Sequence, residues 1–142
     1  MYDDKLDSAR IALKLGLGGA AFLAGADKFF GFLADWPRYL SPFAASILPV
    51  TPRVFMDIVG VIEMVVGLAI LGRWTRIGSF VASVWLVAIA ANLVLAGFFD
   101  VAVRDVEMAI AAYALARLTE VHDAHRAALP TPGAARRVDV AA

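Results

Sequence analysis

The sequence has no cysteine, few charged residues and only two histidines. Without a thiol, the chain cannot form a disulfide framework, a thiol redox pair, an iron–sulfur site or a catalytic cysteine. The histidines, His122 and His125, lie outside every apolar segment, which excludes a haem held by two histidines within the membrane. Their spacing of three residues is more typical of a solvated helix end than of a metal pair, so we expect no metal site.

Charge is scarce as well. Charged residues make up 18% of the 142 positions, and the net charge is zero. The sequence has no run or stripe of basic residues, which a nucleic-acid-binding protein needs to contact phosphates, so we expect no nucleic-acid partner. Hydrophobic residues, in contrast, reach 61% with a mean hydropathy of +0.76, against roughly 45–50% apolar residues in a soluble domain. An excess of this size must face lipid, so the lipid bilayer is the first partner that the sequence predicts.

Four apolar stretches are candidates for membrane spans, at about residues 11–32, 55–71, 77–99 and 101–118. A spanning helix needs about 20 mostly apolar residues. The fourth stretch is the weakest, because Arg104, Asp105 and Glu107 lie in its first two turns and need shielding by neighbouring helices. We therefore predict an all-α polytopic membrane protein, with a four-transmembrane-helix bundle over residues 1–122 and a flexible tail over 123–142.

The first apolar stretch also has the outline of a secretory signal peptide. Basic residues precede it, and Ala24-Gly25-Ala26 has the small side chains of a cleavage site. The aromatic residues Phe29 and Phe30 continue the helix past that point, so we favour retention of this stretch as the first span.

The distribution of cations predicts the orientation. With four spans, the N-terminus, the turn at residues 72–76 and the C-terminal tail share one side of the membrane. That side carries 9 of the 13 Lys and Arg residues, so the positive-inside rule predicts that both termini are cytoplasmic. The outer loop between the first two spans, at about residues 33–54, is long and contains four prolines with Trp36 and Tyr39. It is either a cap on the outer membrane surface or an ordinary loop with aromatic anchors.

Most polar residues at membrane depth fall in the outer half of the predicted bundle. These candidate site residues are Asp27, Lys28, Asp57, Glu63, Asn92, Arg104, Asp105 and Glu107.

Glu63 is the most informative member of this set. Gly60, Glu63 and Gly67 share one helix face, and small residues at this spacing allow a neighbouring helix to approach closely. Glu63 should then point into the bundle. A charge at the bilayer centre costs about 2.5–3.5 kcal/mol on insertion scales, so Glu63 should be paired or protonated. Lys28, Asn92 and Arg104 are the candidate partners.

Three roles remain open for this polar cluster. It could lock the helices together through hydrogen bonds. It could bind a small molecule or a quinone head group, or it could form a proton path. No cofactor is evident in the residues themselves, and a quinone is the one candidate.

Four short motifs resemble the DoxX family of small bacterial four-helix membrane proteins. They are Ala24-Gly25-x-Asp27-Lys28-Phe29, Gly60-x-x-Glu63-x-x-x-Gly67-Leu68, Leu71-Gly72-x-x-Thr75-Arg76 and, typical of a subgroup with a longer outer loop, Asp35-Trp36-Pro37-Arg38-Tyr39-Leu40. The resemblance covers about Arg10 to Glu120.

This resemblance implies a four-helix bundle in the bacterial plasma (inner) membrane. Some relatives resemble the small subunit of a thiosulfate:quinone oxidoreductase, and others accompany redox or detoxification proteins. The family offers no agreed catalytic residues to transfer. We therefore expect an accessory or small subunit of a quinone-linked redox complex, and no freestanding enzyme. The alternative is a small-molecule or quinone carrier, and the partners would be other membrane subunits or further copies of this chain.

Overall fold

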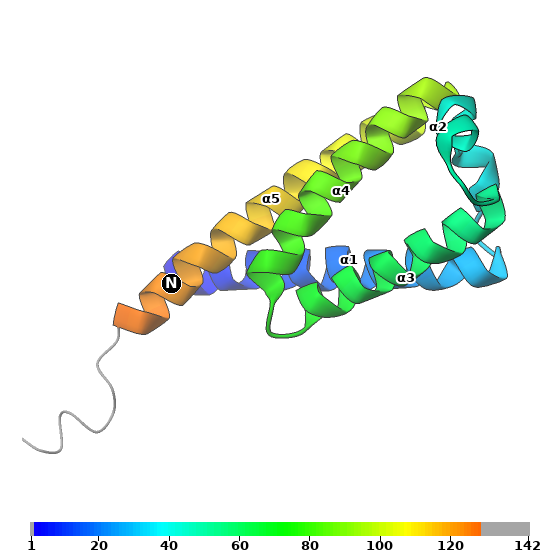
Figure 1. The fold of residues 1–142 in the computed structure, drawn as a ribbon. Coiled ribbons are helices and arrows are strands. Elements are labelled where there is room, and N and C mark those ends of the chain that lie inside the picture. The colour runs from blue at the N-terminus through cyan, green and yellow to red at the C-terminus, as the bar shows by residue number, and fades with distance from the viewer. Residues whose placement is uncertain (1, 129–142) are drawn as a thin grey trace, which may run out of the picture.

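A computed structural model describes residues 2–128, with side chains from residue 4 onward, and all regular secondary structure in this part of the chain is helical. Its elements are α1 (Tyr2–Phe30), the 3-10 helix η1 (Trp36–Tyr39), α2 (Pro42–Ile47), α3 (Pro52–Leu71), α4 (Thr75–Ala96) and α5 (Phe99–Ala128). The long helices form two pairs, α1 with α3 and α4 with α5 (Figure 1). The pairs diverge toward one end of the molecule, where α2 lies between them.

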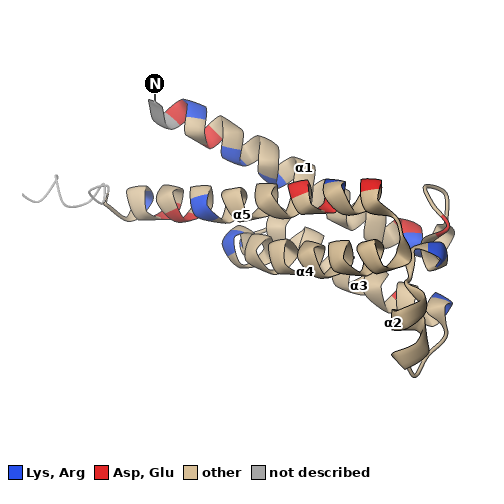
Figure 2. Ribbon diagram, turned by 90° about the horizontal axis from the view of Figure 1, so that it is seen from above, with Lys and Arg blue, Asp and Glu red and all other residues tan. Residues whose placement is uncertain are grey.

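We call this end the loop end, since it holds residues 31–51, and the opposite end the turn end, since it holds the α3–α4 turn at residues 72–74. The termini of the described chain also lie toward the turn end (Figure 1). Charged residues gather toward the two ends of the helices, and α4 carries only one, Arg76 in its first turn (Figure 2).

Three described helices are long and apolar enough to cross a membrane, namely Asp4–Phe30 within α1, α3 and α4. Large apolar side chains on them point away from the protein interior, for example Leu23 at 63% exposure, Val65 at 61% and Val84 at 72%. The exposure of so many large apolar side chains is unfavourable in water and favourable in lipid. The protein is therefore a helical membrane protein.

Several helix boundaries differ from the predicted spans. Helix α1 ends at Phe30 because Gly31 adopts a positive φ of 67°, which favours glycine. Helix α3 begins three residues earlier than expected, since Thr51 Oγ1 accepts a hydrogen bond from the backbone NH of Val54 and Pro52 occupies the first turn. Helix α4 ends at Ala96, because the C-cap residue Gly97 adopts a positive φ of 84°.

The largest difference concerns the predicted flexible tail. Residues 123–128 continue α5 as helix, so for them the prediction was wrong. Alanine favours helix in this segment, and the preceding turn contacts α1 through His122 Nδ1, which lies 3.3 Å from Asp7 Oδ1. Residues 129–142 of the predicted tail lie outside the described part of the chain.

Helices α1 and α3 touch backbone to backbone. A Cβ atom built on Gly25 would lie 2.6 Å from the carbonyl oxygen of Gly60, and one built on Gly60 would lie 2.7 Å from that of Gly25. Two turns further along α3, a Cβ built on Gly67 would lie 2.8 Å from the carbonyl oxygen of Gly18 in α1. Glycines at these positions let two spans approach more closely than any side chain would allow.

We expect Gly25→Ala to lower the free energy of unfolding by about 1–3 kcal/mol, although alanine favours helix by about 1 kcal/mol over glycine, because the new methyl group meets the α3 backbone. The matched control is Gly19→Ala in the same helix, where an added Cβ meets nothing within 4 Å. Unfolding in mixed detergent micelles measures both. Equal effects of the two substitutions would show that α1 and α3 are not in backbone contact.

Candidate functional site

A buried ion pair joins α1 to α3 next to the glycine contact. Lys28 Nζ lies 2.5 Å from Glu63 Oε2, and the two side chains are 4% and 12% exposed. A Cβ built on Gly60 would lie 3.1 Å from Lys28 Cβ, and one built on Gly25 would lie 3.0 Å from Glu63 Cβ, so the close approach of the backbones brings the two side chains within reach of each other. Glu63 therefore points into the bundle and not toward lipid, and its partner is Lys28.

Trp36 covers the other side of the Lys28 ammonium group. Lys28 Nζ lies 3.8 Å from the centroid of the Trp36 ring, which is a cation–π contact. Because the Lys28 side chain is buried, the negative face of the indole attracts its ammonium group more strongly than it would at an exposed position. Lys28 thus has a carboxylate as one neighbour and an aromatic ring as another.

Asp27 holds that tryptophan in place. The Asp27 carboxylate accepts hydrogen bonds from the backbone NH groups of Phe32 and Leu33, at 2.9 and 3.0 Å. It also accepts one from Trp36 Nε1, at 2.8 Å. A carboxylate near a helix C-terminus is repelled by the negative end of the helix dipole. Here the hydrogen bonds from three NH donors offset that cost. Asp27 therefore organises the loop that positions Trp36.

Helices α4 and α5 bring two more polar groups to the ion pair. Asp105 is buried and interacts electrostatically with both Glu63 and Lys28. The indole of Trp85 neighbours Glu63, yet its buried NH has no acceptor in hydrogen-bond geometry within the described chain. The site thus contains two buried carboxylates, one buried cation and one unpaired donor.

Four predicted site residues lie elsewhere. Asn92 was a candidate partner of Glu63, but its side chain donates to Tyr39 O at 2.8 Å and accepts from the backbone NH of Ser41 at 3.0 Å. It fastens the loop to α4 because the loop backbone needs these partners. Asp57 lies 3.4 Å from Arg53 Nε, on a partly exposed helix face.

Arg104 and Glu107 are exposed, while Asp105 is buried. Successive residues of a helix are rotated by about 100°, so Arg104 and Glu107, three positions apart, share one face, and Asp105 points away from that face into the bundle. Arg104 is thus not a partner of Glu63; its Nε lies 3.6 Å from Asp105 Oδ1, with a side chain that is 64% exposed.

The sequence analysis did not assign Trp85 or Trp36 to this site. Trp85 did leave a signal, since an indole NH in the middle of an apolar span requires an acceptor. Trp36 left none, because its place over Lys28 depends on the loop conformation that Asp27 sets. Within the described residues, no group of three or more His, Cys, Asp or Glu side chains could hold a metal ion.

Fold and site together define a helical membrane protein in which a buried ion pair joins two spans. The DoxX family model matches residues 9–101, more than half of the chain. The chain belongs to the DoxX family. The match includes Lys28 and Glu63 and ends before Asp105. Neither the curated proteins nor the solved structures contain a match to the chain.

Removing one partner of the ion pair should cost more than removing both. Lys28→Met or Glu63→Leu alone leaves a buried charge unpaired, which costs about 3–5 kcal/mol, whereas the double variant replaces the pair by apolar groups and should cost less than either single change. The exposed pair Arg53 and Asp57 is the control, with an expected effect below about 1 kcal/mol. Unfolding in mixed micelles measures this cycle. Additive effects of Lys28→Met and Glu63→Leu would contradict the pairing.

Proposed function

We propose that the protein crosses the bacterial plasma membrane four times, with α5 as the fourth span and both termini in the cytoplasm. At 30 residues, α5 is about 45 Å long, which exceeds the roughly 30 Å hydrocarbon core. One of its faces exposes the apolar side chains of Val103, Val106, Ile110 and Tyr113. The opposite face is buried against the bundle and shields Asp105.

Single cysteines test this topology on an otherwise cysteine-free chain. A membrane-impermeant maleimide added to intact spheroplasts should label Asp35→Cys in the loop. Arg73→Cys and Asp123→Cys should react only after permeabilisation, since four spans place both on the cytoplasmic side. The unsubstituted chain gives the background. Labelling of Asp123→Cys from outside would mean that α5 does not span.

The proposed activity is that of a non-catalytic accessory subunit in a quinone-linked membrane redox complex. The observation that carries it is that partners within the fold already engage Lys28 and Asp27. Lys28 contacts Glu63 and Trp36, and Asp27 accepts three hydrogen bonds from the loop. A site of this kind fixes the shape of a bundle and leaves its apolar exterior for lipid and neighbouring subunits. The resemblance of DoxX relatives to an oxidoreductase small subunit supports the redox setting.

A second candidate function is the binding of a quinone head group at the same site. The buried indole NH of Trp85 favours it, because this donor lies beside Glu63 without a well-formed hydrogen bond, and a quinone carbonyl would accept one. Lys28 is the nearby cation that would stabilise negative charge on a second carbonyl or on a reduced quinone.

One preparation separates the two functions. The tagged chain, expressed from its own locus, is purified from native membranes in mild detergent, and its fractions are assayed for partner subunits, quinone-dependent electron transfer and extractable quinone. An accessory subunit should co-elute with a complex that has this activity. A solitary species, together with unchanged quinone-dependent activity in membranes that lack the chain, would contradict this role.

The quinone content of the isolated chain decides the second candidate. Quinone held by Trp85 should bind about fivefold more weakly to Trp85→Phe, which keeps an aromatic ring at this position and removes the NH. Glu107→Gln, an exposed change, should leave the quinone content unaltered. If Trp85→Phe and the unsubstituted chain retain equal amounts, the site does not hold a quinone through this donor.

A further inference from the structure

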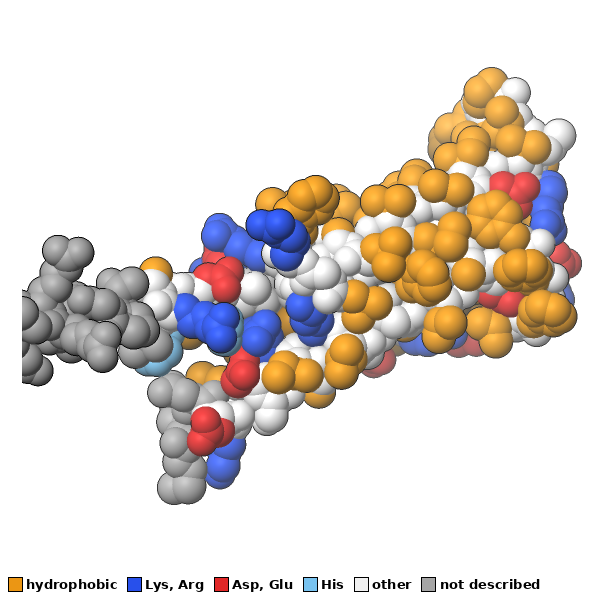
Figure 3. All heavy atoms as spheres, turned by 90° about the horizontal axis from the view of Figure 1, so that it is seen from below, with side chains coloured by type: hydrophobic (Ala, Val, Ile, Leu, Met, Phe, Trp, Pro, Cys, Tyr) orange, Lys and Arg blue, Asp and Glu red, His pale blue; other side chains and the backbone are white. Residues whose placement is uncertain are grey.

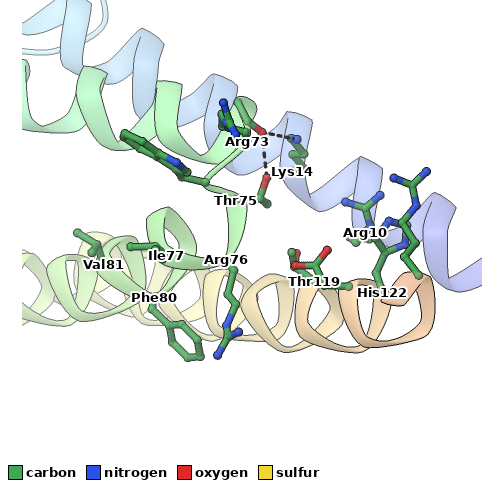
Figure 4. Close-up of a pocket in the computed structure, with 14 residues that line it drawn as sticks. Arg10, Lys14, Arg73, Thr75, Arg76, Ile77, Phe80, Val81, Thr119 and His122 are labelled. Carbon is green, nitrogen blue, oxygen red and sulfur yellow. Dashed lines mark hydrogen bonds between the residues drawn. The ribbon is translucent and has the colours of Figure 1, made fainter. Parts of the chain in front are cut away.

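A second polar region lies at the turn end, far from the Lys28–Glu63 pair in the fold. It is a cavity of about 780 Å³ between the turn at residues 72–74, the first turns of α4, and parts of α1 and α5 (Figure 4). Cationic side chains from every one of these segments line it. They are Arg10, Lys14, Arg73, Arg76 and Arg126, with His122 beside them.

Carboxylates neutralise only part of this charge. Asp123 is the one carboxylate in the lining. Outside the lining, Asp7 pairs with Arg10 at 2.7 Å, and Glu120 pairs with Arg76 at 2.7 Å and with Arg117 at 2.5 Å. Lys14 Nζ donates to the carbonyl oxygen of Gly72 at 2.8 Å, which leaves its charge without a carboxylate.

Arg73 and Arg126 form no ion pair with a described residue. The cavity therefore retains an excess of positive charge even when its neighbouring carboxylates are counted. An excess of fixed cations around a cavity favours an anionic ligand.

The start of α4 adds to this field. Trp74 occupies the N-cap position and provides no side-chain cap. The Thr75 hydroxyl donates to Ile70 O at 2.8 Å, so it does not cap the helix either. The first NH groups of this 22-residue helix thus bring the positive end of its dipole to the cationic cavity.

One wall of the cavity is apolar and continues onto the outer surface of the spans. Trp74, Ile77 and Val81 belong to the lining and are 65%, 66% and 47% exposed. In the space-filling view, the cationic side chains at the turn end border the apolar side chains that cover the rest of that face (Figure 3). A ligand that fits both walls has an anionic head and an apolar tail.

We infer that the turn-end cavity binds the phosphate group of an anionic phospholipid, with Arg73 and Arg126 as its principal cationic contacts and acyl chains along Trp74, Ile77 and Val81. Arginine presents a planar fork of donors that matches phosphate oxygens. Basic pockets between spans at a membrane surface suit such head groups, and phosphate is the chemistry that a lipid shares with free phosphate ions. This inference is independent of the proposed orientation, because both membrane surfaces present lipid head groups.

Native mass spectrometry of the full chain in detergent tests the inference, with phosphatidylglycerol and phosphatidylcholine as probes. Wild type should bind phosphatidylglycerol more tightly than phosphatidylcholine. Arg73→Gln/Arg126→Gln should weaken phosphatidylglycerol binding about tenfold and leave phosphatidylcholine binding unchanged, because each surface cation contributes modestly to attraction. Arg73→Lys/Arg126→Lys should restore part of the preference.

The control is Arg38→Gln/Arg53→Gln, which removes the same charge from exposed positions at the loop end and should leave the lipid preference intact. Unfolding midpoints confirm that all variants fold. A competition arm with inorganic phosphate against chloride at equal ionic strength identifies the source of the ligand. Displacement by phosphate, without any preference between lipids, would support the phosphate chemistry and overturn the lipid. Equal binding of both lipids with no effect of phosphate would overturn the inference.

Discussion

Lys28 and Glu63 meet where the backbones of α1 and α3 are in direct contact, and the rest of the loop end is arranged around that meeting point. Glycines on both helices bring the spans close enough for the two side chains to reach each other. Burying either charge alone would be costly in lipid, so each requires the other. Trp36 covers the pair, and Asp27 fixes Trp36 by gathering three NH donors from the loop. A local contact between two helices thus sets the course of residues 31–39.

The molecule has different chemistry at its two ends. At the loop end, the buried Lys28 pairs with Glu63, and the buried Asp27 accepts hydrogen bonds from the loop. At the turn end, cations surround a cavity and outnumber the carboxylates near it. Apolar side chains cover the helices between these ends. This division suits a bundle that is held rigid at one membrane surface and that contacts charged groups at the other.

Much of this could be predicted from sequence, for reasons tied to particular residues. The first three apolar runs coincide with the three described helices that are long and apolar enough to cross a membrane, and the spacing of Gly60, Glu63 and Gly67 placed Glu63 on an interhelical face. The rotation of α5 about its axis was harder to foresee, because Asp105 faces the bundle while its near neighbours Arg104 and Glu107 share an exposed face. Lys28, Asn92 and Arg104 were all candidate partners of Glu63, and the loop decided against Asn92, because hydrogen bonds to the loop backbone engage its side chain. The turn-end cavity is lined by residues from three segments that are distant in the sequence, and no local sequence pattern predicts that these segments lie together.

Solid-state NMR in lipid bilayers offers the most direct measurement of the Lys28–Glu63 contact. The chain has three lysines and three glutamates, so labelling of lysine side-chain nitrogen and glutamate carboxyl carbon gives few candidate pairs. The account predicts a strong nitrogen–carbon dipolar coupling that disappears in Glu63→Gln and persists in Glu107→Gln. Absence of this coupling in the unsubstituted chain, or its survival in Glu63→Gln, would contradict the account.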